Sequence, residues 1–255
     1  RKEIAYLENR TNPKVISLKS GKSRRLLPAK YNYSYSDGDQ WFRWSPDSKW
    51  LLVTFGQKER VMSDEVGLVK ASGEGEVINL TKSGYSDSAP RWSKKGKLMT
   101  WATTRQGSFG ENRGAVSRDI YAMFFTQEAF DRFNLSEEEY GLLKEKEEKN
   151  KEETNGENET EKKKRDKGKE EKEEVEELAF DMKNIEDRKE RLTIHTSRLR
   201  DWVLSDDGEK LYYLTRFEGK YNIWETELRT KKTKIFAKLN AGNADMELPE
   251  DEKFI

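Results

Sequence analysis

The chain has 255 residues, of which 33% are hydrophobic and 38% are charged, and its 49 basic side chains equal its 49 acidic ones in number. The zero net charge gives no indication of a nucleic-acid-binding surface, which would need a basic excess on one face. The absence of cysteine excludes disulfides and thiolate-bound metals, and no apolar run approaches the ~18 residues of a membrane span.

Taken in chain order, the sequence repeats one pattern: a short aromatic strand, a polar turn that begins with serine, and an apolar run. The turn serine is Ser45 in "RWSPDSKWLLVTF", Ser93 in "RWSKKGKLMTW" and Ser205 in "VLSDDGEKLYYL". Near the start, "KEIAYLENR" is similar to the strand after such a turn, and Leu248 takes the serine's place near the end. A period of about 40 to 50 residues with several strands per unit is typical of a β-propeller.

We therefore predict an all-β fold made of propeller blades, each with four antiparallel strands, and a helical, charged insertion in one blade. The predicted parts of this one propeller are a partial blade at 1–30, blades at 41–81, 89–193 and 199–239, and the start of a further blade at 246–255. Because the first unit begins in mid-repeat and the last unit ends in mid-repeat, we expect the chain to be a piece of a longer protein.

The interval between Ser93 and Ser205 is about twice the period, but it contains only one set of strands. We interpret it as one blade with an insertion at 126–177 between its third and fourth strands. The insertion opens with two phenylalanines at helical spacing and a serine and glutamate at capping-box spacing, namely Phe130, Phe133, Ser136 and Glu139. We expect two short helices docked on the blade rim.

A charged run follows, from Lys144 to Glu177, in which 26 of 34 residues are Asp, Glu, Lys or Arg. Such a composition cannot bury enough apolar surface to pack against a core. We expect a charged stalk, either a solvated helix or a disordered segment, and leave open whether it binds a partner.

No catalytic set is evident. His195 is the only histidine, and the nearby Ser205 belongs to the repeated turn, whose counterparts Ser45 and Ser93 have no histidine near them. The glycine-rich "GSFGENRG" at 107–114 lacks the Lys-Ser/Thr end of a phosphate loop. The acidic turn residues show no metal-ligand spacing. We predict no catalytic, cofactor-binding or metal-binding residue in this chain.

Arg43 and Arg91 stand out because each lies two places before a turn serine, on the innermost strand of its blade. Two interpretations remain open. Each arginine could bond to a neighbouring blade, since charges this deep are usually paired. Alternatively, both could line the central channel and bind peptide carboxylates.

The Trp-Ser-Pro-Asp turn with four strands is similar to the propeller repeats of TolB and of the tricorn-type peptidases. The segment "RDIYAMFFTQEAFDRFNLSEEEYGLLKEKEE", its Lys/Glu-rich continuation, and "LSDDGEKLYYLTRFEGKYNIWETELR" resemble the propeller region of bacterial tricorn-like serine peptidases. The resemblance covers nearly the whole chain. In that family the catalytic His, Ser and Glu belong to a separate core, which no position of this chain matches.

The resemblance implies a non-catalytic propeller portion that gates or channels peptides, or unfolded protein substrates, to a protease core outside this chain. It also implies assembly as a homo-oligomer. The alternative is a TolB-like protein-binding propeller module of the cell envelope without enzymatic activity. Both the bacterial periplasm or cell envelope and the cytoplasm remain open as its location.

Overall fold

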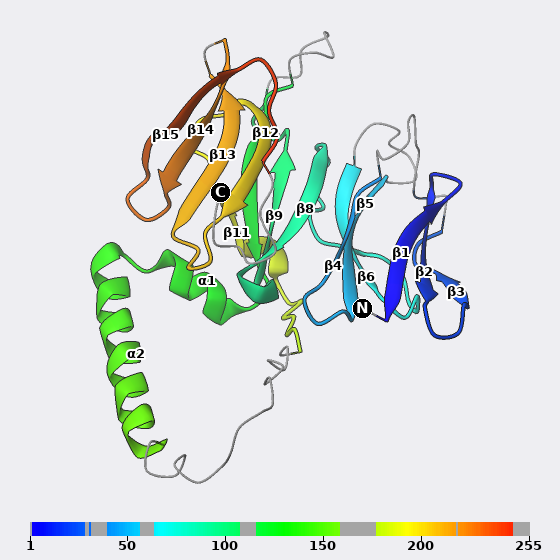
Figure 1. Ribbon diagram of the computed structural model, residues 1–255, viewed down its shortest axis with the longest axis horizontal. Helices are drawn as coiled ribbons and strands as arrows, with labels where there is room; N and C mark the ends of the chain where they lie inside the picture. The colour runs from blue at the N-terminus through cyan, green and yellow to red at the C-terminus, as the bar shows by residue number, and fades with distance from the viewer. Residues whose placement is uncertain are drawn as a thin grey trace.

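The computed structural model describes residues 2–28, 31, 40–56, 64–107, 116–158, 177–217 and 219–246, with side chains of 151–158 excepted. Within these residues the chain forms four antiparallel sheets, which follow one another in chain order across Figure 1. The further blade predicted at 246–255 lies outside the described residues beyond Met246.

Sheet I has three strands in the order β1-β2-β3. Sheets II, III and IV each have four strands, paired in sequence order as β4-β5-β6-β7, β8-β9-β10-β11 and β12-β13-β14-β15. In sheet I the strands are β1 Glu3–Glu8, β2 Asn12–Ser17 and β3 Ser23–Arg25. In sheet II they are β4 Phe42–Trp44, β5 Trp50–Gly56, β6 Asp64–Lys70 and β7 Ile78–Asn79. In sheet III they are β8 Asp87–Ser93, β9 Leu98–Thr103, β10 Asp119–Phe124 and β11 Lys189–Arg191. In sheet IV they are β12 Arg198–Leu204, β13 Lys210–Arg216, β14 Tyr221–Glu227 and β15 Lys232–Ala241. The predicted four-stranded antiparallel sheets are therefore confirmed.

The repeated turn has the same hydrogen bonds in sheets II and IV. Ser45 Oγ donates to Asp47 Oδ1 at 2.5 Å and accepts the backbone N–H of Trp50 at 2.9 Å. Ser205 repeats both bonds, with Asp207 at 2.7 Å and with the first residue of β13 at 2.9 Å. The serine and aspartate thus close the turn and fix where the next strand begins, which explains why the pattern recurs.

The turn of sheet III is built differently, because a lysine replaces the aspartate. Ser93 makes no capping bond, and Lys94, Lys95 and Gly96 take left-handed φ values of 50°, 54° and 91°. A Cβ on Gly96 would lie 2.5 Å from Leu178 Cδ2. Glycine is favoured here by its φ of 91°, which other residues rarely adopt, and by Leu178, where the chain returns from the insertion and packs on the turn.

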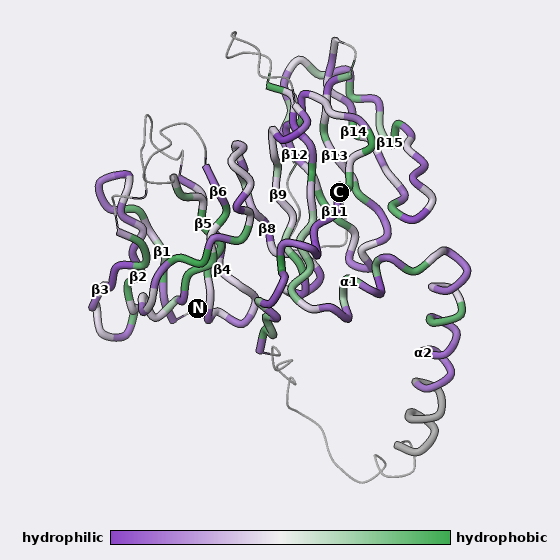
Figure 2. Tube along the Cα trace, turned by 180° about the vertical axis from the view of Figure 1, so that it is seen from behind, coloured by the Kyte–Doolittle hydropathy of each residue, from purple (hydrophilic) through white to green (hydrophobic). Residues whose placement is uncertain are grey.

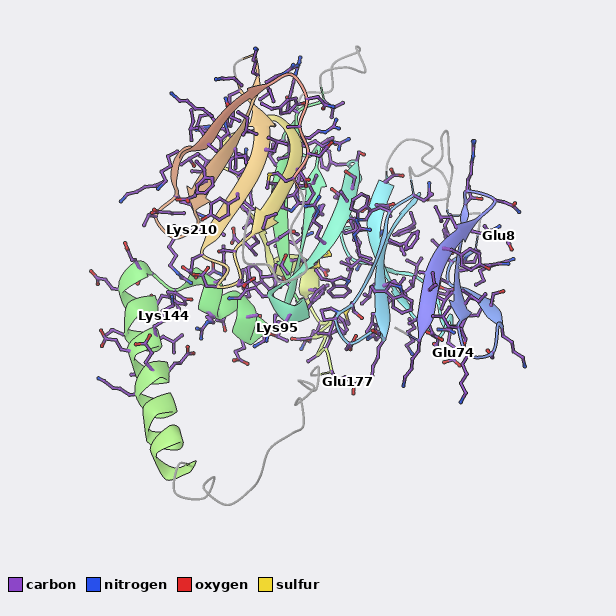
Figure 3. All side chains as sticks on the ribbon, in the orientation of Figure 1. Glu8, Glu74, Lys95, Lys144, Glu177 and Lys210 are labelled. Carbon is purple, nitrogen blue, oxygen red and sulfur yellow. The ribbon has the colours of Figure 1, made fainter. Side chains whose placement is uncertain are left out.

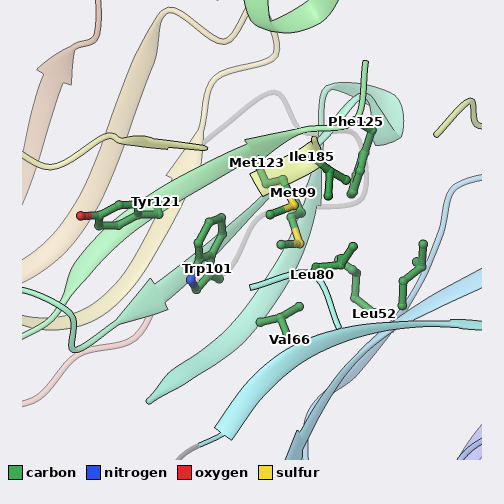
Figure 4. Close-up of a cluster of buried hydrophobic side chains, with 10 residues drawn as sticks. Leu52, Val66, Leu80, Met99, Trp101, Tyr121, Met123, Phe125 and Ile185 are labelled. Atoms are coloured by element: carbon green, nitrogen blue, oxygen red, sulfur yellow. The ribbon is translucent and has the colours of Figure 1, made fainter. Parts of the chain in front are cut away.

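An apolar layer fills each interface between neighbouring sheets. Between sheets II and III, Leu52 and Val66 meet Met99 and Met123 (Figure 4). Strands β5 and β9 are buried along almost their whole length, as their continuous apolar runs predicted. Figure 2 shows the contrast between the hydrophobic β5 and the mostly hydrophilic helix of the insertion.

The insertion forms α1 (Gln127–Asn134) and α2 (Glu137–Asn158). Phe130 and Phe133 of α1 pack on Phe124, with ring centroids 5.6 and 4.8 Å apart. The capping box between the helices is confirmed: Ser136 Oγ accepts the Glu139 N–H at 3.2 Å, and Glu139 Oε2 accepts the Ser136 N–H at 2.9 Å.

The sequence predicted a short second helix, and this prediction is wrong. The helix α2 has 22 residues, extends into the charged segment and projects away from the sheets (Figure 1). Its glutamates and lysines recur at helical spacing, so that Glu145 lies four residues before Lys149. Such pairs stabilise an exposed helix without any core contact.

Arg229, in the turn between β14 and β15, holds the insertion against sheet IV. Its guanidinium pairs with Glu209 at 2.6 Å and lies 3.7 Å from the ring centroid of Tyr140. It also donates to the backbone carbonyl oxygens of Arg132 and Phe133 at 3.2 and 3.0 Å. These carbonyls end α1 and have no partner inside the helix, so one cation satisfies them and complements the helix dipole.

The chain returns from the insertion against sheets II and III. The Leu178 N–H donates to Asp47 Oδ2 at 3.1 Å, and the Phe180 ring lies 5.2 Å from Trp50 and 4.9 Å from Phe125. Arg188 is buried and donates from Nε to the Phe124 carbonyl at 3.2 Å. Each end of the insertion is therefore fixed to a different neighbour of sheet III.

A buried carboxyl group lies at the start of β8. Asp87 is fully buried; its Oδ2 accepts the Ser83 hydroxyl at 2.6 Å, and its Oδ1 has no hydrogen-bond partner among the described residues. Burial raises the pKa of Asp87, the Ser83 hydrogen bond opposes this, and the negative charge of Glu65 adds to the rise. The folded state therefore binds this proton more tightly than the unfolded state does.

We predict that Arg229→Gln lowers the free energy of unfolding by about 3 kcal/mol, because Glu209 and the α1 carbonyls lose a buried partner. Urea unfolding of the 255-residue chain measures this. Arg200→Gln is the control, since its pair with Asp245 at 2.7 Å is exposed, and exposed pairs contribute little. Equal losses in the two variants would contradict the anchoring role of Arg229.

We also predict that Asp87→Asn stabilises the chain at neutral pH. Because the folded pKa of Asp87 is raised, its contribution to stability increases as pH falls through that pKa, so the gain in the variant should shrink toward acid. Asp245→Asn should behave oppositely: the hydrogen bond from Arg200 lowers the pKa of Asp245, so its contribution is lost as pH falls. Unfolding curves at a series of pH values distinguish the two signs, and a gain for Asp87→Asn that grows toward acid would refute the assignment.

Candidate functional site on the first strands of the sheets

Tryptophan side chains tie the first strand of each four-stranded sheet to the neighbouring sheet. Trp41 Nε1 donates to the Pro90 carbonyl at 3.0 Å, and Trp92 Nε1 donates to the Arg43 carbonyl at 3.2 Å. On the other side of sheet III, Trp202 Nε1 donates to Thr100 Oγ1 at 2.9 Å. The first strands β4, β8 and β12 are therefore held in a fixed relation, and their side chains occupy fixed positions.

Arg91 joins β8 to β12. Its Nη2 donates to Asp201 Oδ1 at 2.5 Å and its Nη1 to the Trp202 carbonyl at 2.5 Å. The guanidinium also lies 4.3 Å from the ring centroid of Trp202. Asp201 is mostly buried and accepts the Trp202 N–H as well, at 2.9 Å. This is the geometry expected of a bond between neighbouring sheets.

Arg43 has a different environment. Its side chain is exposed, its guanidinium lies 4.3 Å from the Trp41 ring centroid, and its hydrogen bond is a long one of 3.4 Å to the Phe42 carbonyl. No carboxylate of the described residues pairs with it. Partial burial and the positive charge of Arg91 lower the pKa of Arg43, yet a guanidinium stays protonated in proteins.

The positive charges of the two arginines affect each other, but the two side chains differ in their hydrogen-bond partners. Arg91 donates hydrogen bonds to Asp201 and Trp202. Among the described residues, Arg43 donates only one long hydrogen bond and lies against the Trp41 ring. Such a guanidinium suits a planar carboxylate, which it binds through two parallel hydrogen bonds.

The structure does not bring His195 and Ser205 together. His195 precedes β12 and lies edge-on to Phe217, with ring centroids 6.3 Å apart. Ser205 follows β12, and the seven residues of that strand span about 20 Å. Among the described residues there is no cluster of three metal-ligating side chains, and none of their helices is long and apolar enough to cross a membrane.

A cavity of 1210 Å³, which the sequence did not reveal, lies between the insertion and the turns of sheets III and IV. Its walls carry the charged residues Lys94, Arg132 and Glu209 beside Tyr140. Lys94 Nζ donates to the Asp207 carbonyl at 2.6 Å, and burial, together with the charge of Arg132, lowers the pKa of Lys94. Figure 3 shows Lys95, Lys144 and Glu177 at this end of the molecule. The one signal in the sequence was the replacement of the turn aspartate by lysine in "SKKGK".

No family model matches the chain, and no curated protein matches it. Among solved structures, TolB from Acinetobacter baumannii is 16% identical with a TM-score of 0.47, over 92% of this chain and 41% of TolB. A puromycin-hydrolyzing peptidase of Mycobacterium tuberculosis is 10% identical with a TM-score of 0.47, over 92% of this chain and 29% of the peptidase. The β-propeller domain of Myceliophteria thermophila Cps50 (Swd1) is 8% identical with a TM-score of 0.44, over 95% and 57%. The chain spans less than two thirds of each of these proteins.

We predict that Arg91→Gln lowers the free energy of unfolding by about 1–3 kcal/mol, because Asp201 and the Trp202 carbonyl lose their partner. Arg43→Gln should change the free energy of unfolding little, since it removes only one weak hydrogen bond and an exposed stacking contact. Denaturant unfolding of the two variants measures both effects. A larger loss for Arg43→Gln than for Arg91→Gln would show that the roles are reversed.

Proposed function

We propose that this chain is a non-catalytic β-propeller portion of a tricorn-like serine peptidase, which gates or channels peptides to a protease core outside the chain. The blades are 41–81, 89–193 and 199–239, with the partial blade 1–30 before them. The stacking of four antiparallel sheets through their faces supports the propeller, as does the fixed relation of their first strands.

The observation that carries the proposal is the exposed guanidinium of Arg43 on the first strand of sheet II. A protein that handles peptides of any sequence needs a contact that every peptide offers, and the terminal carboxylate is such a group. Arg43 provides the donors, and the Trp41 ring orients them. Arg91 adds positive potential while holding sheets III and IV together.

The alternative is a TolB-like protein-binding module without an enzyme. The cavity beside the insertion supports it, because charged and aromatic side chains from α1, α2 and two sheet turns meet there in one concave surface. The two functions place the ligand at different residues, Arg43 on β4 or the side chains of the cavity beside the insertion, which makes them separable by mutation.

The test compares fluorescein-labelled unstructured peptides that differ only in a free or an amidated carboxyl terminus. We predict that the chain binds the free acid more tightly, that Arg43→Gln weakens this binding about tenfold, and that the preference weakens with salt. The measurement is fluorescence anisotropy at low and high salt.

Arg25→Gln is the matched control, since Arg25 is exposed on β3, in sheet I, and its loss changes the net charge equally. The control should retain the preference for the free acid. Equal binding of the acid and the amide, or equal losses in both variants, would refute the role of Arg43 and favour the alternative function.

A further inference from the structure

The last strand of sheet IV is unlike the last strands of the other sheets. β3, β7 and β11 have three, two and three residues, whereas β15 has ten. β14 pairs with one edge of β15, and the other edge has no partner strand among the described residues (Figure 1). Proteins usually keep such edges short, because an unpaired row of N–H and C=O groups recruits another strand.

The side chains of β15 add to this exposed edge. Ile235, Phe236 and Leu239 are 37%, 49% and 44% exposed, and they are among the large hydrophobic side chains with the greatest exposure in the described chain. The strand keeps regular pairing over 232–235, opposite 224–227 of β14, before its register shifts. The regular part therefore offers a straight edge, and the shifted part limits how far another strand can pair.

Charge on β15 indicates the kind of strand that fits. Lys232 and Lys234 stand opposite Glu227 and Glu225 of β14, and Lys234 pairs with Glu225 at 3.1 Å. Acidic residues on an added strand would place these lysines between two rows of carboxylates, and cross-strand pairs of opposite charge are stabilising. Lys238 is exposed beyond the register shift and adds a further positive charge to the strand.

The same lysines disfavour pairing between two copies of this chain. A two-fold axis at Thr233 would set Lys232 opposite Lys234, and an axis at Lys234 would set that lysine opposite its own copy. Like charges directly opposite each other destabilise a strand pair.

We propose that the outer edge of β15 is a strand-addition site for an extended segment of a partner protein in which acidic and apolar residues alternate. Backbone hydrogen bonds to the edge supply affinity that does not depend on sequence, and the lysines and Ile235 select the side chains. The proposal does not depend on the proposed function, because the site lies on the last strand of sheet IV and uses neither Arg43 nor the cavity.

The test uses the 255-residue chain and a synthetic peptide with alternating Glu and Val. We expect the peptide to bind and to slow amide hydrogen exchange within 232–236. The same peptide with N-methylated backbone nitrogens keeps its side chains but loses its donors, so it should not bind. A Lys/Val peptide should bind more weakly than the Glu/Val peptide.

The decisive variant is Lys232→Glu with Lys238→Glu, which leaves the Lys234–Glu225 pair intact. We expect it to bind the Glu/Val peptide about tenfold more weakly and the Lys/Val peptide more tightly than the native chain does. Lys19→Glu with Lys22→Glu is the control, because both lysines are exposed near the β2–β3 turn and the net charge changes equally. The control should bind like the native chain.

Three results would overturn the proposal: no binding of the Glu/Val peptide at millimolar concentration, exchange protection outside β15, or equal binding by both double variants. Sedimentation provides a fourth criterion. If the native chain self-associates and Lys232→Glu with Lys238→Glu abolishes this, the occupant of the edge is a second copy and the proposal of an acidic partner is wrong.

Discussion

The structure depends on the burial of the middle strands on both faces. Strands such as β5 and β9 are apolar on each side, so no single sheet can cover its own hydrophobic residues. Sheets II and III therefore need a neighbour on either side, and their stability comes from the interfaces between sheets as much as from the pairing within them. The tryptophan bonds between first strands then set how one sheet is positioned on the next.

The insertion uses this arrangement without disturbing it. It leaves sheet III after β10 and returns before β11, and these two strands still pair directly. At its start, Arg229 satisfies the last carbonyls of α1 from sheet IV. At its end, Asp47 of sheet II accepts the Leu178 N–H. One helix end and one extended segment therefore connect three sheets.

Much of the fold could be predicted because its signals are local. The bonds of Ser45 and Asp47 are complete within one turn, and the strands that follow are continuous apolar runs, so sequence alone located both. The capping box of Ser136 and Glu139 is local as well. The partner of Arg91 could not be predicted, because Asp201 lies about two periods further along the chain. The role of Arg229 could not be predicted either, because its partners Arg132, Phe133 and Tyr140 lie in the insertion, far from it in the sequence. The length of α2 was underestimated because its highly charged part from Lys144 onward can specify either a solvated helix or disorder.

The two anchors of the insertion have a mechanical consequence. A force that separates sheet IV from sheet III must pull Arg229 away from the end of α1, and a force that separates sheet II from sheet III must pull Asp47 away from Leu178 and Trp50 away from Phe180. The insertion therefore reinforces both interfaces of sheet III. When the molecule is stretched, sheet III should be the last of the four sheets to separate from its neighbours.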